Sequence, residues 1–270
     1  MKHLVLIGWI LAAAPCRAQQ KDSIATIKLF LKACNAYKTL PVRVDVDIAN
    51  SANYIVEARD TSHTRARFCL RKEGSYIAFD EMEQLANDSL MLLVDTTMRK
   101  MLLYQHRNSL TQEMKAALGW QTRDSSVKRM AAQCLVGADL LTTDTAEIRM
   151  TDRRTVGTSG LPVEVIVVLY NPANFQPYLI RQVRRGLIPL SAQDYQQLSL
   201  APDARKELFF HSGDSWAIIR EKVSVFRYDR ISHMENELLP ASIYDRVTRD
   251  TDGNFKPAPK YEGYLVVKQF

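Results

Sequence analysis

The chain has 270 residues, of which 46% are hydrophobic and 24% charged, and its formal net charge is +6. So small a basic excess argues against nucleic acid as the partner of an exported chain. No segment beyond the first 18 residues is apolar over a length that could cross a bilayer, which excludes a transmembrane helix.

Residues 1–18 predict a cleaved signal peptide. Lys2 supplies a positive charge, residues 4–14 form an apolar segment, and residues 16–18 match a small-x-small cleavage site. The apolar segment is too short to span a hydrocarbon core of about 30 Å as a helix. Pro15 argues against lipidation of the cysteine that follows it, because such sites carry a small residue before the cysteine. We therefore expect export to the periplasm.

Removal of this segment takes away two basic residues and no acidic one, which leaves a net charge of +4 and three cysteines, Cys34, Cys69 and Cys134. Their spacing contains no C-x-x-C pair, which excludes a zinc ribbon and a thioredoxin motif. In one interpretation, two of the three cysteines form a disulfide and the remaining one is a free thiol. Three buried thiols that pack as small hydrophobic groups is the other, and we favour it.

The rest of the chain contains no Pro/Gly/Ser-rich linker, internal repeat or low-complexity tract. About 250 residues can bury one large core or two small ones. We predict a single domain over 19–270, with a helical insertion near 191–207.

The first elements of this domain are a helix and a series of alternating strands. Apolar residues recur at helical spacing over 23–37, and Pro41 ends the helical pattern. Over 42–48 apolar and charged residues alternate strictly, which predicts a half-buried antiparallel strand. Further strands are predicted at 55–59, 65–71 and 76–79, joined by short turns into a meander.

A hairpin over 90–104 is predicted to form the middle of the sheet. It follows a polar excursion over 80–89, and residues 95–97 suit its turn because their side chains bond nearby backbone groups. Its strands are apolar at nearly every position and must be covered on both faces. We expect a helix or an apolar guest over the second face.

The second half of the chain mixes helical and strand patterns. Segments 110–118 and 126–138 have helical periodicity and are natural covers for the sheet. Further strands are predicted at 146–151, 162–170, 178–187, 216–228 and 264–270. Segment 233–263 is rich in proline and charge, and only a turn at 252–254 is predicted there.

The polar motifs favour structural interpretations over catalytic ones. Residues 211–214 (His-Ser-Gly-Asp) suit a hairpin turn, because catalytic triads are assembled from distant positions. Asp250, Asp252 and Asn254 alternate as calcium ligands do, yet no bidentate glutamate follows at the required distance, which favours a hairpin tip. The histidines show no metal-ligand spacing, and no cofactor motif is present.

Two further groups of charged residues have both a structural and a functional interpretation. Glu81, Glu83 and Asp88 could act as paired carboxylates, although such acids more often solvate a loop. A group of five arginines could form a basic patch for a lipid headgroup or an acidic partner, or simply a solvated strand face: Arg153, Arg154, Arg181, Arg184 and Arg185.

Apolar strands outnumber the helices available to cover them, so we predict an apolar cavity between sheet and helices. Alternation and position within the apolar runs select its candidate lining residues, which are Val44, Val46, Phe68, Leu70, Leu92, Val94, Val165 and Val167.

The order of these elements resembles the LolA/LolB-like fold of periplasmic lipoprotein carriers and, more narrowly, exported proteins of that type in the Bacteroidetes. The likeness rests on the helix 23–37, the meander over 42–79, the pattern N-D-x-L-x-L-x-V-D at 87–95 and the strand 162–170 with its partner. It implies an α+β fold in which a strongly curved antiparallel sheet, an incomplete barrel, is covered by a few helices. It also implies a cavity that takes the acyl chains of lipoproteins.

Segments 191–207 and 233–263 depart from the family pattern, and no position matches the arginine that latches the lid of its transport members. We therefore expect a non-enzymatic periplasmic protein that binds a lipid or the acyl chain of a lipoprotein, with peripheral contact to a membrane, the outer one included. The alternative is an envelope protein–protein interaction module that binds through a sheet edge or its basic face. A hydrolase that uses His211 or the pair Glu81 and Glu83 is the third hypothesis.

Overall fold

The computed structural model describes residues 23–35, 39–105, 124–202, 204–238 and 242–269. The predicted signal peptide and the predicted helix over 110–118 lie outside these residues. The described residues form two compact units. Unit 1 contains 23–34, 49–62 and 124–225, and unit 2 contains 35–48, 63–105 and 226–269. That 19–270 forms a single domain stays a prediction.

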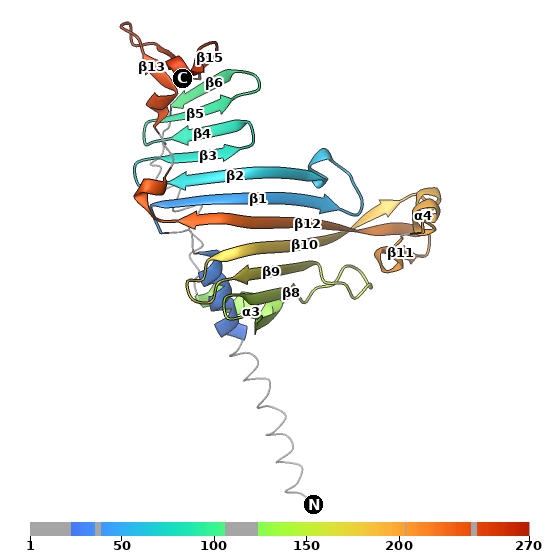
Figure 1. Ribbon diagram of the computed structural model, residues 1–270. Helices are drawn as coiled ribbons and strands as arrows, with labels where there is room; N and C mark the ends of the chain where they lie inside the picture. Colours follow the sequence, from blue (N-terminus) through green and yellow to red (C-terminus); the bar gives the residue numbers. More distant parts are fainter. Residues whose placement is uncertain (1–22, 36–38, 106–123, 203, 239–241, 270) are drawn as a thin grey trace, which may run out of the picture. The chain divides into compact units, whose positions relative to one another are not determined.

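The described strands and helices are shown in Figure 1. The strands are β1 (Val42–Ala52), β2 (Ser62–Leu70), β3 (Ser75–Phe79), β4 (Met82–Ala86), β5 (Leu90–Asp95), β6 (Lys100–Gln105), β7 (Cys134–Leu140), β8 (Ala146–Asp152), β9 (Glu164–Tyr170), β10 (Pro177–Leu190), β11 (Phe209–Ser212), β12 (Ser215–Ser232), β13 (Val247–Arg249), β14 (Phe255–Pro257) and β15 (Leu265–Lys268). The helices are 23–34, α3 (Asp124–Gln133) and α4 (Ala192–Ser199). Of these described helices, none is both long and apolar enough to cross a membrane.

Thirteen strands form one mostly antiparallel sheet, which confirms the α+β class. The strand order is β15-β6-β5-β4-β3-β2-β1-β12-β10-β9-β8-β7, and β11 pairs with β12. A separate hairpin joins β13 to β14. Among the described strands no ladder joins β15 to β7, so the sheet is not closed. Neither closure nor strong curling is found, so the incomplete barrel is not confirmed.

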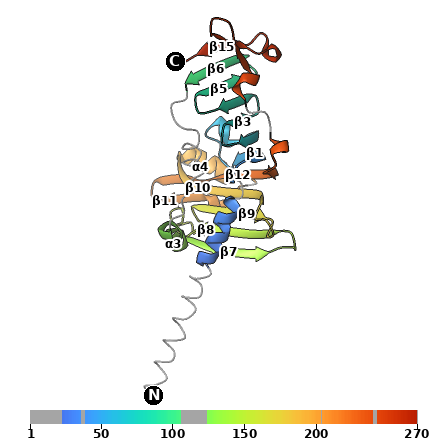
Figure 2. The ribbon, with the colours of Figure 1, turned by 90° about the vertical axis from the view of Figure 1, so that its left-hand side faces the viewer.

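In unit 1, the helix over 23–34 lies directly on β8 and β9 (Figure 2). Its apolar side chains Ile27, Phe30 and Leu31 pack in one buried cluster with Ile148 and Val168, as the helical periodicity requires. The helix thus buries the apolar face it was predicted to have. The protein's own side chains fill this helix–sheet interface, where we expected a cavity.

Two predicted elements of unit 1 are wrong. The helix expected over 126–138 ends at Gln133, and β7 then pairs with β8 along its whole length, because Cys134 and Val136 alternate inward at period two. The strand expected over 55–59 is a loop with a 3-10 turn. The carboxylate of Asp60 accepts hydrogen bonds from backbone N–H groups in this loop, which removes those donors from any strand ladder.

In unit 2, the meander is confirmed without the strand expected over 55–59, and it gains one strand, β4. β1 to β6 are neighbours in sequence order, and β4 lies where we expected only a polar excursion. The excursion folds as a strand because Leu85 packs into the core and Glu83, on the same face, pairs with Arg246. The β5–β6 hairpin is near one end of the strand order and not in its middle, with only β15 beyond it.

The second face of the β5–β6 hairpin is covered by the described residues of the C-terminal segment, 238 and 242–264. Leu92, Val94 and Leu103 are fully buried beneath it. The residues of the cover belong to 3-10 turns and to the β13–β14 hairpin and its flanks: Leu238, Ile243, Val247, Ala258 and Tyr261. The chain itself therefore supplies the cover for which we expected a helix or a guest.

Candidate functional site

An apolar cavity of about 250 Å³ opens on one face of three neighbouring strands of unit 2. The strands are β2, β1 and β12, with β1 in the middle. The described residues that line the cavity all belong to strands, and they are Val42, Val44, Val46, Ile48, Phe68, Leu70, Phe226 and Tyr228. We call this space the apolar cavity.

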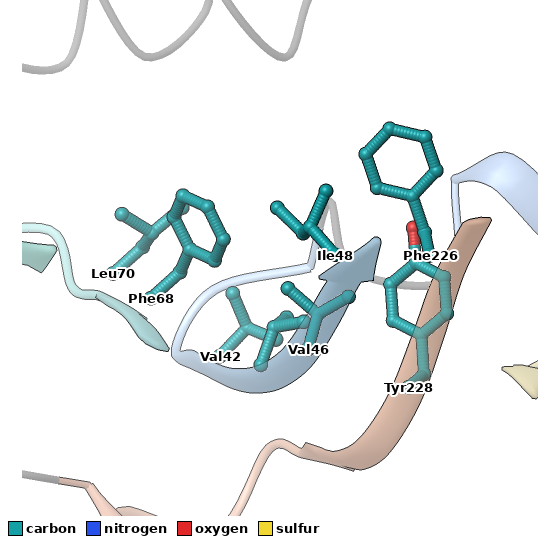
Figure 3. A pocket seen from close by; sticks show the side chains of 8 residues that line it. Val42, Val46, Ile48, Phe68, Leu70, Phe226 and Tyr228 are labelled. Carbon is teal, nitrogen blue, oxygen red and sulfur yellow. The ribbon is translucent and has the colours of Figure 1, made fainter. Parts of the chain in front are cut away.

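Strand alternation builds the cavity. Every second residue of β1 from Val42 to Ile48 points to the same face, so four aliphatic side chains form its floor. Figure 3 shows Phe68 and Leu70 on one flank of these residues, with Phe226 and Tyr228 on the other. The valines of the floor are buried, whereas the flanking side chains are half-buried. The flanks therefore form an apolar rim that is open to solvent.

The opposite face of β1 is charged and satisfied by the protein itself. Arg43 pairs with Asp45 at 2.7 Å and donates to the Glu237 carbonyl at 2.9 Å. His63 lies 2.9 Å from Asp47, and this hydrogen bond lowers the pKa of the Asp47 carboxyl. The charged side chains of this face thus pair with one another, and from Val42 to Ile48 the other side of the strand offers apolar surface to a guest.

Four of the eight predicted lining residues meet in the apolar cavity: Val44, Val46, Phe68 and Leu70. The prediction did not include Val42, Ile48, Phe226 and Tyr228. Val42 and Ile48 continue the alternation of Val44 and Val46, so the sequence contained their signal. Phe226 and Tyr228 belong to β12, and nothing in the sequence indicates that this strand lies beside β1.

Leu92 and Val94 lie on the other face of the sheet. The register pairs Leu92 with Leu85, Leu85 with Tyr76, and Tyr76 with Cys69. Cys69 lies between two cavity residues on β2 and therefore points away from the cavity. Leu92 and Val94 therefore also point away from the cavity, and they are buried beneath the C-terminal segment.

Val165 and Val167 belong to β9 in unit 1. They alternate with Ile166 and Val168, which pack against the helix over 23–34, so they point away from that helix. The structure does not bring them together with the other candidates.

The comparisons with known proteins concern the fold. No family model matches the chain, and no curated protein matches it. Solved structures similar to the chain include the following three. A LolA superfamily protein from Nitrosomonas europaea is 13% identical, with 80% of this chain and 94% of that chain covered and a TM-score of 0.25. A domain from Vibrio parahaemolyticus, described provisionally as an outer membrane lipoprotein-sorting protein, is 7% identical, with coverages of 78% and 93% and a TM-score of 0.25.

A DUF1329 family protein from Desulfovibrio piger is 7% identical, with coverages of 80% and 98% and a TM-score of 0.26. The family likeness that the sequence indicates is thus found among solved structures. TM-scores this low carry no argument about function, which must come from the chain's own residues.

The residues of the hydrolase hypothesis have structural partners. His211 stacks on Trp216 with ring centroids 3.8 Å apart, in the predicted hairpin turn between β11 and β12. Glu81 accepts a hydrogen bond from the Thr96 hydroxyl at 2.6 Å, and Glu83 pairs with Arg246 at 3.2 Å. These contacts hold turns and strands together.

The five arginines do not form one patch. Arg154 pairs with Asp152, and Arg184 pairs with Glu164, whereas Arg185 lies on the other face of β10 and pairs with the buried Glu221.

No cluster of potential metal ligands occurs among the residues that the structure describes. Cys34, Cys69 and Cys134 are not linked by a disulfide; Cys69 is buried and the other two are half-buried.

A cluster of charges holds the loop between β1 and β2 in unit 1. The Asp60 side chain is fully buried and pairs with Arg220 and with Lys222, the latter at 2.9 Å. It also accepts the backbone N–H groups of Val56 at 2.8 Å and Glu57 at 3.0 Å. Burial alone would raise the pKa of this carboxyl, but the hydrogen bonds outweigh burial and hold the pKa well below its usual value of 3.8.

Acid should therefore destabilise the protein partly through Asp60. Because the pKa is lower in the folded state than in the unfolded state, the stabilisation is complete above about pH 4 and is lost as the pH falls further. We expect Asp60→Asn to be less stable than the wild type at pH 7 and to lose less stability between pH 7 and pH 3. Urea denaturation at both pH values measures this. An equal loss in the two proteins would contradict the assignment.

Proposed function

We propose that this protein is a non-enzymatic carrier that binds an acyl chain, of a lipid or of a lipoprotein, in the apolar cavity. The observation that supports this most is the cavity itself, about 250 Å³ with eight apolar or aromatic lining residues. Ligand pockets of drug size measure roughly 300–1,000 Å³, so this one suits a segment of a single chain.

The chemistry of the lining supports an apolar guest. The floor consists of valine and isoleucine side chains, and among the described lining residues the Tyr228 hydroxyl is the one polar side-chain group. Such a lining provides neither a carboxylate nor an imidazole for acid–base chemistry. It does favour methylene groups, each of which contributes about 0.8 kcal/mol when it is removed from water.

The predicted signal peptide over 1–18 supports the periplasm as the compartment in which this carrier acts. A lipoprotein acyl chain in transit to the outer membrane is a cargo that this compartment offers. The strongly curved sheet implied by the family resemblance belongs to the same proposal, because a sheet that curves around β1 would enclose more of the bound acyl chain. A carrier of this kind needs no cofactor.

A series of saturated fatty acids of increasing length tests the proposal. Each acid is titrated against protein loaded with cis-parinaric acid, whose fluorescence reports displacement. Because a buried methylene contributes about 0.8 kcal/mol, affinity should rise about fourfold per added CH₂ group. The rise should stop at the length that fills the cavity.

Two results would contradict the proposal: no saturable binding of cis-parinaric acid, or affinities that do not depend on chain length. If fatty acids did not bind and an affinity pull-down yielded one stoichiometric protein and no lipid, the interaction module would be the correct alternative.

A further inference from the structure

A second pocket of unit 1 has the opposite chemistry to the apolar cavity. It measures about 280 Å³, and all its described lining residues are polar: Asn50, Arg59, Gln182, Arg184, Lys222 and Ser224. Three of the six are cations, and no acidic residue belongs to the described lining. We call it the cationic pocket.

The cations are held in place by acids that lie behind them. Glu57 is 2.7 Å from the Nε of Arg59 and 3.1 Å from the Nζ of Lys222. Glu164 is 2.7 Å from the Nε of Arg184 and accepts the Gln182 amide at 2.6 Å. Ion pairs of this kind orient long side chains before a ligand arrives, which lowers part of the entropy cost of binding.

These pairs leave donors for a ligand. A guanidinium group carries five N–H donors, and the acids of both arginines engage the Nε. The terminal nitrogens of Arg59 and Arg184 therefore remain to bind an anion, and both side chains are largely exposed, at 78% and 69%. Cations on three separate segments suit a tetrahedral oxyanion better than a carboxylate, whose two oxygens one arginine can already engage.

We propose that the cationic pocket binds the phosphate group of a phosphorylated ligand. A phospholipid headgroup and a free phosphate compound both offer this chemistry. The loop that carries Arg59 bears on the lipid source, because Ile55 and Val56 are exposed at 61% and 59%. The hydrogen bonds to Asp60 hold this apolar tip in place. Cations beside exposed apolar side chains suit a membrane surface.

The test compares two arginines on opposite faces of β10. Arg184 lines the cationic pocket, whereas Arg181 is exposed on the other face and loses the same charge when replaced by glutamine. Binding of inorganic phosphate is measured by calorimetry at low ionic strength, and vesicles of phosphatidylglycerol are measured by co-sedimentation. Charge-assisted hydrogen bonds lead us to expect that Arg184→Gln weakens phosphate binding about tenfold or more, and that Arg181→Gln hardly changes it.

Vesicle co-sedimentation distinguishes a lipid headgroup from a free phosphate compound as the ligand. For a lipid headgroup, the double variant Ile55→Ser/Val56→Ser should lose vesicle binding and keep phosphate binding. Phosphate binding that depends on Arg184, without vesicle binding, assigns the pocket to a free phosphate compound. The proposal is overturned if phosphate does not bind, or if the two arginine variants behave alike. If the apolar cavity and the cationic pocket are independent sites, Arg184→Gln leaves the affinities for fatty acids unchanged. The phosphate proposal and the carrier proposal can therefore fail separately.

Discussion

Replacing Val46 by tryptophan should abolish acyl-chain binding while leaving the fold nearly as stable as before. Val46 lies on the floor of the apolar cavity, between the aromatic side chains of β2 and β12 (Figure 3). An indole at this position enters the space that the acyl chain needs. In a closely packed core the added atoms would cost about 1–3 kcal/mol, but an open cavity accepts them at little cost. The readouts are cis-parinaric acid fluorescence and the urea midpoint of unfolding.

Two matched variants complete this experiment. Val94→Trp places the same change in the sealed core beneath the C-terminal segment and should cost the full overpacking energy or more. Arg67→Trp places it on the other face of β2, at an exposed residue, and should leave binding intact. If Val46→Trp destabilised the protein as strongly as Val94→Trp, the cavity would be a packed core and the carrier proposal would fail.

Glu221→Ala should lower the free energy of unfolding by about 3–5 kcal/mol, the usual cost of removing one partner from a buried ion pair. The Glu221 carboxylate is 9% exposed and binds two arginines, Arg185 at 2.6 Å and Arg205. Arg185 also donates to the Pro162 carbonyl at 3.0 Å, so the carboxylate ties β12 to β10 and, through Arg185, to the residues just before β9. Its loss leaves Arg185, which is 13% exposed, without its counter-charge.

The control is another glutamate, Glu207, which also pairs with Arg205. Glu207 lies 2.8 Å from Arg205, and both side chains are 54% exposed. An exposed pair contributes about 0–1 kcal/mol, so Glu207→Ala should have little effect on urea denaturation at neutral pH. Equal effects of the two substitutions would show that the buried network is not a main source of stability in unit 1.

The sequence predicted the elements whose pattern is local. Strict alternation over 42–48 gave β1 and four residues of the cavity, because period two assigns each side chain to a face. The helical stripe gave the helix over 23–34, and two apolar runs flanking a turn gave the pairing of β9 with β10. These elements need no knowledge of distant residues.

The features that the sequence could not predict depend on contacts between distant segments. The two faces of β5 look equally apolar in the sequence, so nothing indicated that residues 238 and 242–264 seal the face of Leu92 and Val94. The loop over 53–61 is set by the pairing of Asp60 with Arg220, which is 160 residues away. The cationic pocket likewise draws its residues from β1, β10, β12 and this loop, and its six residues form no motif.

Native mass spectrometry of the protein purified from a cell-envelope fraction tests the central claim most directly. The claim is that the face of β1 between β2 and β12 stays open and holds an acyl chain. We predict a wild-type protein that carries a bound species of lipid or acyl mass, and a Val46→Trp variant of the same fold that carries none. A wild-type protein that shows only its own mass, or an adduct that persists in Val46→Trp, would contradict the account.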